Sequence, residues 1–235
     1  MGRLDGQVAI VTGGSRGIGK AIAYALGSEG AHVVLAARME ADLKNAAHDL
    51  KSEGLSASAI VADVTSEGSV HSLVDEVIRS RGRIDILVNN AGIGVFKNVS
   101  EMTIADFDAM WDVNMRGVFL ATKEVLPHMM HASSGNIINI ASLAGKNSFK
   151  GGAGYCATKW ALRGFASSLM LEVRDHNIRV VTIFPGSVDT AFSRTGKRGP
   201  MITQPEDVAD AVIFAVTAPA RTMISEIDVR PTRPA

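Results

Sequence analysis

Tyr155 and Lys159 are the two side chains whose types and spacing best suit proton transfer in this sequence. They lie four positions apart in a stretch of helical periodicity, so both side chains project from one face of the expected helix. A free tyrosine has a pKa near ~10. A neighbouring ammonium group favours the phenolate and lowers that pKa, which lets the phenol exchange a proton with an alcohol or carbonyl oxygen. Ser142, directly after an apolar run, offers a further hydroxyl.

A glycine-rich segment, residues 12–19 (TGGSRGIG), follows the apolar run 8–11 and opens a stretch of helical periodicity. Glycine lets a pyrophosphate approach the backbone and sit on the free amides of a helix amino terminus, where the helix dipole favours negative charge. The spacing differs from G-x-G-x-x-G, and a tight turn alone would also use glycine. The position between a strand and a helix favours a dinucleotide site.

The residues after the second apolar run indicate which dinucleotide is bound. Proteins that bind NAD usually place an acidic residue there, to hold the ribose 2′-hydroxyl. This chain has Ala37 and then Arg38. An arginine at the start of a helix opposes the helix dipole, and the 2′-phosphate of NADP is a suitable anionic partner for it. Arg16 could share this role. The alternative interpretation is that Arg38 is simply a solvent-exposed arginine with no ligand.

Residues 89–92 (NNAG) follow the apolar run 84–88. Two asparagines and a glycine are typical of a turn, which is the simpler interpretation. Because the segment also lies at the carboxyl end of a predicted strand, a place in a ligand crevice is an equal alternative.

Short apolar runs alternate with stretches of helical periodicity along the whole chain, and this alternation predicts the fold. The runs are too short for helices and rich in β-branched residues, as buried parallel strands are. The expected strands are residues 8–11, 33–35, 59–61, 84–88, 137–140, 180–184 and 227–229. The pattern predicts an α/β fold with a doubly wound parallel sheet, helices on both faces, and a ligand crevice at the carboxyl ends of the strands.

Composition narrows the class of partner and the location. The 24 Lys and Arg residues balance 24 Asp and Glu residues, so nucleic acid and anionic membranes are not expected as partners. No signal peptide is expected, no apolar run reaches membrane-spanning length, and the single cysteine, Cys156, excludes an intramolecular disulfide. We therefore expect a cytoplasmic protein that forms one domain, residues 1–235, and acts on a small molecule.

No metal site is expected. One thiol cannot build a cysteine zinc site, and Cys156 is simply explained as a small side chain on a packed helix. His128 and His131 share a spacing that a metal could use, but no set of carboxylates lies beside them. We interpret them as a polar helix end.

Together these motifs resemble the short-chain dehydrogenase/reductase family, from Leu4 to about Val229. The matching segments are TG-x-x-x-GIG (12–19), DV (63–64), NNAG (89–92), Asn114, Ser142, Y-x-x-x-K (155–159) and PG (185–186). The resemblance implies a seven-stranded Rossmann fold and a reductase that prefers NADP. It implies Tyr155 as the acid/base, with Lys159 lowering its pKa and holding the nicotinamide ribose. It further implies that Ser142 orients the carbonyl and that Asn114 anchors a water-linked proton relay.

The resemblance also implies where the dinucleotide lies. Asp63 and Val64 would meet the adenine, Asn90 and Gly92 would lie along the cofactor, and residues 185–190 would flank the nicotinamide. The expected cofactor-binding residues are Gly13, Ser15, Arg16, Gly17, Ile18, Gly19, Arg38, Asp63, Val64, Asn90, Gly92, Tyr155, Lys159, Pro185, Gly186, Val188 and Thr190.

The expected function is NADPH-dependent hydride transfer to a ketone or aldehyde, or from a secondary alcohol in reverse. Reduction of a 3-oxoacyl thioester is the alternative. A basic trio in the expected small lid, residues 187–204, favours it, and a carboxyl terminus without the glycine-rich segment of carrier-dependent members disfavours it. A noncatalytic dinucleotide sensor or scaffold is a weaker alternative, because it does not need the four catalytic residues together. The trio is Arg194, Lys197 and Arg198.

The resemblance further implies a homodimer or homotetramer, built on the helices that carry Asn114 and Tyr155. The substrate pocket is expected to be mostly apolar. Its expected residues are Gly94, Val95, Phe96, Leu143, Phe149, Gly152, Ser187 and Phe192.

Overall fold

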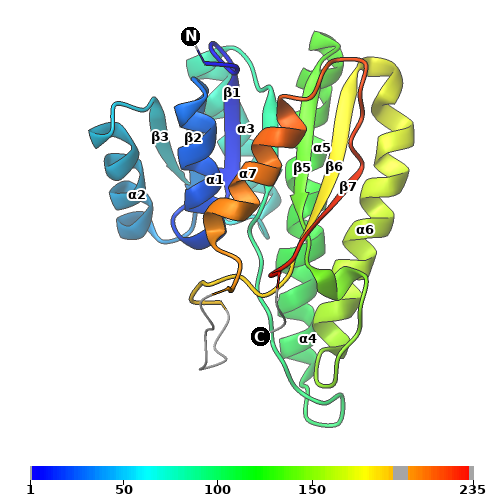
Figure 1. Ribbon diagram of the computed structural model, residues 1–235. Coiled ribbons are helices and arrows are strands. Elements are labelled where there is room, and N and C mark those ends of the chain that lie inside the picture. Colours follow the sequence, from blue (N-terminus) through cyan, green and yellow to red (C-terminus); the bar gives the residue numbers. More distant parts are fainter. Residues whose placement is uncertain (1, 193–200, 233–235) are drawn as a thin grey trace.

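The protein is described by a computed structural model that covers residues 2–192 and 201–232. A seven-stranded parallel sheet forms its centre (Figure 1), in the strand order β3-β2-β1-β4-β5-β6-β7. The strands are β1 (Val8–Thr12), β2 (His32–Ala37), β3 (Ala57–Val61), β4 (Ile86–Asn89), β5 (Gly135–Ile140), β6 (Ile178–Pro185) and β7 (Glu226–Val229). The predicted doubly wound Rossmann fold is confirmed.

Helices of eight to 21 residues connect the strands. They are α1 (Gly17–Ser28), α2 (Glu40–Ser52), α3 (Glu67–Arg81), α4 (Ile104–Trp111), α5 (Gly117–Ala132), α6 (Ala153–Val173) and α7 (Pro205–Val216). A π-helical turn, Asp112–Arg116, joins α4 to α5, and a 3₁₀ turn, Leu143–Gly145, follows β5. No helix in the described part of the chain is long and apolar enough to cross a membrane.

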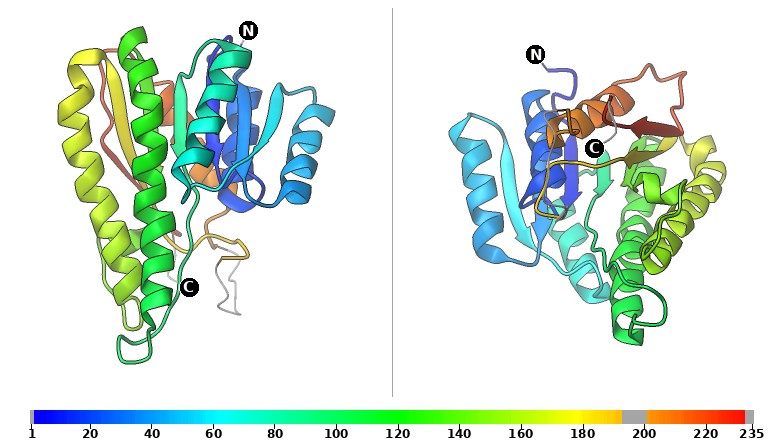
Figure 2. Two further views of the ribbon diagram at one scale, coloured as in Figure 1. Left: turned by 180° about the vertical axis from the view of Figure 1, so that it is seen from behind. Right: turned by 60° about the horizontal axis from the view of Figure 1, so that its bottom comes forward.

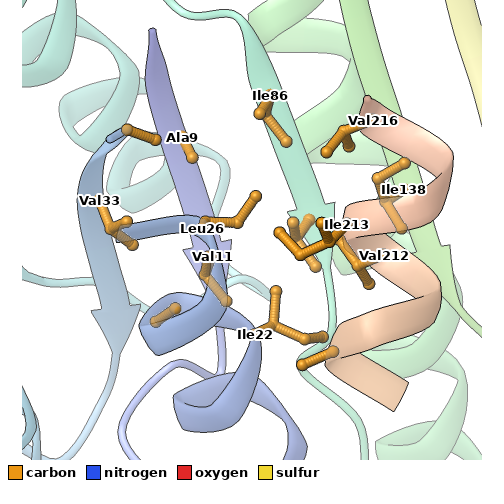
Figure 3. Packing of buried hydrophobic residues seen from close by; sticks show 14 of the residues in the cluster. Ala9, Val11, Ile22, Leu26, Val33, Ile86, Ile138, Val212, Ile213 and Val216 are labelled. Carbon is orange, nitrogen blue, oxygen red and sulfur yellow. The ribbon is translucent and has the colours of Figure 1, made fainter. Parts of the chain in front are cut away.

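The helices form a layer on each face of the sheet. Helices α1, α2 and α7 cover one face, and α3, α5 and α6 cover the other, which Figure 2 shows from behind. The alternation of strand side chains produces this arrangement, because Val11 faces the first layer and Ile10 the second. In Figure 3, Ile22 of α1 and Val212 of α7 meet over the sheet. The inner strands β1, β2, β4, β5 and β6 are therefore largely buried on both sides, as their continuous apolar runs predict, whereas the edge strands β3 and β7 are partly exposed.

The strand order reverses beside β1, which pairs with β2 on one side and β4 on the other. Connections from neighbouring strands therefore leave in opposite directions and open a crevice at the carboxyl ends of the strands. The predicted strand 84–88 begins later, at Ile86. Asp85 lies just before it and binds Val8, because its carboxylate accepts the Val8 amide proton and its own amide donates to the Val8 carbonyl.

Candidate functional site

The glycine-rich turn lies between β1 and α1 at the crevice. Gly13 and Gly17 have φ angles of 64° and 53°, a left-handed conformation that glycine adopts without steric cost. A Cβ atom on Gly19 would collide with the Gly13 carbonyl, so the turn and the helix can approach each other only with glycine there. The first turn of α1, within the described range 17–28, contains no acidic residue. The N-cap residue Arg16 makes no side-chain cap hydrogen bond, so the amides of this turn are of the kind that can bind an anion.

Asn90 holds this turn in place from the end of β4. Its side-chain amide donates to the carbonyls of Thr12 at 2.9 Å and Gly13 at 3.1 Å. The Thr12 hydroxyl accepts the backbone amides of Asn90 at 3.0 Å and Ala91 at 3.1 Å, and donates to the Val88 carbonyl at 3.2 Å. Asn89 ends β4 and residues 90–92 form no turn, so the turn interpretation is wrong; the segment lies at the carboxyl end of β4, beside the glycine-rich turn. The sequence marked Thr12 only as the first residue of the glycine-rich motif and did not predict its contacts with Asn90 and Ala91.

Arg16 and Arg38 are both exposed at the edge of this crevice. Arg38 follows β2, and Asp63 follows the neighbouring β3. A hydrogen bond from the Thr65 amide is the main cause that lowers the pKa of Asp63, and the charge of Arg38 lowers it further. Val64 lies against the start of α5, since a Cβ atom on Gly117 would come within 2.8 Å of Val64 Cγ2.

Asn114 lies in the π-helical turn and is 1% exposed. Its Oδ1 accepts the amide of Ile93 at 2.9 Å, and its Nδ2 donates to the Ile93 carbonyl at 2.9 Å and to the Thr158 hydroxyl at 3.0 Å. The Thr158 hydroxyl donates to the Tyr155 carbonyl at 2.8 Å. Asn114 therefore joins the loop after β4 to the first turns of α6. Sequence reasoning missed Thr158, and its place beside Lys159 was the only available signal.

Ser142, Tyr155 and Lys159 meet at the carboxyl end of β5. The Ser142 hydroxyl caps the 3₁₀ turn by accepting the Ala144 amide at 3.1 Å, and it is hydrogen-bonded to the Tyr155 phenol. Lys159 Nζ lies 5.8 Å from the centroid of the Tyr155 ring and donates to the Ile140 carbonyl at 3.1 Å. The predicted sharing of one helical face is thus observed for Tyr155 and Lys159.

Burial controls the pKa values of this pair. It raises the pKa of Tyr155 to about 12, against the opposite effect of the hydrogen bond with Ser142. Burial also lowers the pKa of Lys159 to about 8. The expected lowering of the Tyr155 pKa by Lys159 is therefore not observed, because desolvation of the phenolate is the larger effect. At neutral pH the phenol carries its proton and is a proton donor.

Residues after β6 lie beside the glycine-rich turn. The Gly186 amide donates to the Val229 carbonyl at 2.8 Å, just beyond Pro185 at the end of β6. Val188 forms a bridge with Thr203. A Cβ atom on Gly17 would lie 3.4 Å from Thr190 Cγ2. Arg194, Lys197 and Arg198 lie outside the described residues.

Gly92 lies between Asn114 and Lys159, since a Cβ atom on it would be 3.4 Å from Asn114 Oδ1 and 3.7 Å from Lys159 Nζ. The expected pocket residues Phe96, Phe149 and Phe192 gather near Tyr155 from three separate loops. In the described part of the chain no group of three or more His, Cys, Asp or Glu side chains could hold a metal ion. Cys156 is buried on α6.

Three comparisons relate this geometry to known proteins. The family model for short chain dehydrogenases matches residues 7–199. An uncharacterised oxidoreductase of Staphylococcus aureus is 37% identical over 229 residues, which are 97% of this chain and 98% of that protein. Relatives of similar identity occur in Staphylococcus epidermidis, at 36% over 234 residues.

Two solved structures share the fold and much of the sequence. A metagenomic short-chain oxidoreductase in complex with NADP is 39% identical with a TM-score of 0.88, over 99% of this chain and 100% of that one. An alcohol dehydrogenase from the archaeon Thermococcus sibiricus, complexed with 5-hydroxy-NADP, is 32% identical with a TM-score of 0.90, over 97% and 99% of the two chains. The chain belongs to the short-chain dehydrogenase/reductase family of oxidoreductases.

Proposed function

We propose that this protein is an NADPH-dependent carbonyl reductase, which transfers a hydride to a ketone or aldehyde and oxidises secondary alcohols in reverse. The observation that carries this proposal is the meeting of Ser142, Tyr155, Lys159 and Asn114 within one hydrogen-bonded region at the carboxyl ends of β4 and β5. A noncatalytic dinucleotide sensor needs no such combination.

The glycine-rich turn and the two arginines near it suit the binding of NADP. The left-handed conformation of Gly13 and the close approach of Gly19 leave room for a pyrophosphate over the amides at the start of α1. Arg16 and Arg38 add exposed positive charge where a 2′-phosphate would lie, and Ala37 brings no carboxylate to repel it. The NADP in the metagenomic relative and the 5-hydroxy-NADP in the archaeal one support the same choice.

The mechanism assigns separate tasks to the side chains. The bound cofactor supplies the hydride. Tyr155 holds its proton until a carbonyl oxygen becomes negative and then donates it. Ser142, already hydrogen-bonded to the phenol, orients that oxygen. The ammonium of Lys159, fixed by the Ile140 carbonyl, stabilises the phenolate that remains.

Asn114 helps to position Tyr155 and does not itself donate or accept the transferred proton. Its amide and Thr158 form a chain of hydrogen bonds that ends at the Tyr155 backbone. The π-helical turn supports the proposed relay role, because such a turn disrupts the regular helical hydrogen-bond pattern at Asn114.

Initial rates of NADPH oxidation with a panel of ketones, aldehydes and an acetoacetyl thioester test the proposal. We expect turnover of simple ketones or aldehydes and its loss in Ser142→Ala. Turnover of the thioester alone would instead establish the 3-oxoacyl reductase alternative. Cofactor binding without turnover of any carbonyl compound would contradict both and favour the sensor.

We further propose a cytoplasmic homo-oligomer of one-domain chains, with residues 187–204 bordering the substrate. Large apolar side chains are exposed along α4, α5 and α6, the helices beside Asn114 and Tyr155. Large apolar side chains exposed on neighbouring elements are typical of a protein interface. The side chains are Phe107 (41% exposed), Trp111 (40%), Phe119 (47%), Trp160 (46%) and Leu171 (60%).

A further inference from the structure

Two phenylalanine rings, Phe96 and Phe192, contact the Tyr155 ring, and a third, Phe149, contacts Phe96; the three come from loops that are far apart in the sequence. Phe96 lies in the loop after β4, Phe149 before α6, and Phe192 after β6. The Phe96 ring centroid is 5.4 Å from that of Tyr155 at an interplanar angle of 79°, and the Phe192 centroid is 5.9 Å from it at 46°. Phe149 lies 5.8 Å from Phe96. These four rings form the aromatic cluster.

The outer rings of the aromatic cluster are only half covered by protein. Phe96 is 50% exposed, Phe149 48% and Phe192 45%, whereas Tyr155 beneath them is 7% exposed. Gly94 allows the close approach of two of them, because a Cβ atom there would lie 2.8 Å from both Phe96 Cζ and Phe192 Cζ. Large aromatic surface that is left in water beside a reactive phenol is suited to contact with a ligand.

Apolar side chains of the described residues pack against Tyr155 in the aromatic cluster. Lys97, the residue after Phe96, directs its ammonium to Asp106 at 2.7 Å. Met102 and Met110 pack behind Tyr155, where their flexible side chains adapt to the shape of a neighbour. The rings of Phe96 and Phe192 meet at 83°, an edge-to-face arrangement that another ring can extend.

We infer that the aromatic cluster binds an aromatic ring of the substrate, so that the substrates are ketones or aldehydes with an aryl group a few bonds from the carbonyl. This inference rests on the proposed function, because it needs the carbonyl oxygen at Tyr155. With the oxygen there, the rest of the substrate extends across Phe96 toward Phe149 or Phe192. An aryl group then meets ring edges and faces on more than one side.

Benzylacetone and its cyclohexyl analogue test this inference. In both ketones two methylene groups separate the ring from the carbonyl, so the intrinsic reactivity of the carbonyl is the same. We expect kcat/KM with NADPH to favour benzylacetone by about 3- to 10-fold, mainly through KM, as one or two aromatic contacts would provide. Phe96→Leu and Phe149→Leu should bring this ratio close to one.

Phe214→Leu is the matched control, because Phe214 is 63% exposed on α7 and lies outside the aromatic cluster. The ratio of kcat/KM for benzylacetone to that for the cyclohexyl analogue should be the same in this variant as in the unmodified protein. Comparable kcat/KM values for the two ketones with the unmodified protein would overturn the inference and leave the proposed function intact. A preference for benzylacetone that survives in both cluster variants would also overturn it. Failure of every ketone and aldehyde to react would overturn the proposed function and the inference together.

Discussion

Lys146 Nζ lies 2.6 Å from Asp228 Oδ1 and ties the turn that follows Ser142 to the last strand of the sheet. The same ammonium is 2.8 Å from Glu226 Oε2 and 4.1 Å from the centroid of the buried Phe184 ring. Burial opposes ionisation of Asp228, but hydrogen bonds with Lys146 and Arg230 outweigh it and hold the pKa of this carboxyl below its ordinary value. The ion pair thus fixes one end of the turn that presents the Ser142 hydroxyl.

Lys146→Met should therefore loosen the position of Ser142. We expect the free energy of unfolding in urea to fall by about 1 kcal/mol. We also expect kcat to fall by about 10-fold, because a small misplacement of an orienting group is costly. Lys146→Arg should retain most of the free energy of unfolding and most of kcat. Lys44→Met, which removes an exposed ion pair with Glu40 on α2, should change neither. An unchanged kcat in Lys146→Met would show that β7 does not position Ser142.

Tyr155→Phe removes the proton donor while it keeps the shape of the ring. Turnover should fall at least ~100-fold, the lower end of a general-acid contribution. The affinity for NADPH, measured by fluorescence titration, should remain because the phosphate cradle is untouched. Near-normal turnover in this variant would refute the assignment of Tyr155.

Ala37→Asp combined with Arg38→Leu should narrow or invert the cofactor preference. The unmodified protein should prefer NADPH over NADH by about 10- to 150-fold in kcat/KM, the value of one charge-assisted contact of roughly 1.5 to 3 kcal/mol. The double variant provides an acceptor for the ribose hydroxyls and removes the phosphate partner. Equal efficiencies of the unmodified protein with both cofactors would mean that Arg38 is merely solvated.

His32 should make the fold sensitive to mild acid. Burial is the main cause that lowers the pKa of His32 to about 4, and its ring nitrogens lie 2.8 Å from Ser56 Oγ and 3.0 Å from Ser58 Oγ. Between pH 6.5 and 4 the unfolded chain binds a proton that the folded chain does not, so stability falls as the pH falls. The loss from this group totals about 3 kcal/mol at the lower limit.

The test is urea denaturation across this pH range for the unmodified protein and for His32→Gln, whose amide can still bond the serines. The variant should lose less stability between pH 6.5 and 4 than the unmodified protein loses. Parallel pH profiles would show that the imidazole takes up its proton in the folded state as readily as in the unfolded one.

Light scattering should give a mass that is a multiple of the 24.8 kDa chain. Leu171→Asp on α6 places a charge on the proposed interface and should lower that mass, because a buried unpaired charge is costly. Phe214→Asp on α7 should leave it unchanged. A single-chain mass for the unmodified protein at micromolar concentration would exclude the oligomer.

The sequence by itself determined the architecture and the types of residue at the site. The inner strands β1, β2, β4, β5 and β6 are local, mostly apolar runs that are largely buried on both faces, so they could be identified without knowledge of their neighbours. Gly13 and Gly17 likewise mark a turn whose left-handed conformation is a local property of the backbone. These features survive in the structure with strand ends shifted by one or two residues.

Only the tertiary structure decided how the side chains act on one another. Lys159 is close to Tyr155 as predicted, yet burial raises the phenol pKa, because desolvation depends on all the atoms packed around a group. The contact of Lys146 with Asp228 spans 82 positions, and it exists because β6 and β7 are neighbours in the sheet. Such contacts depend on the order of the strands and the approach of distant loops, which no local pattern of residues specifies.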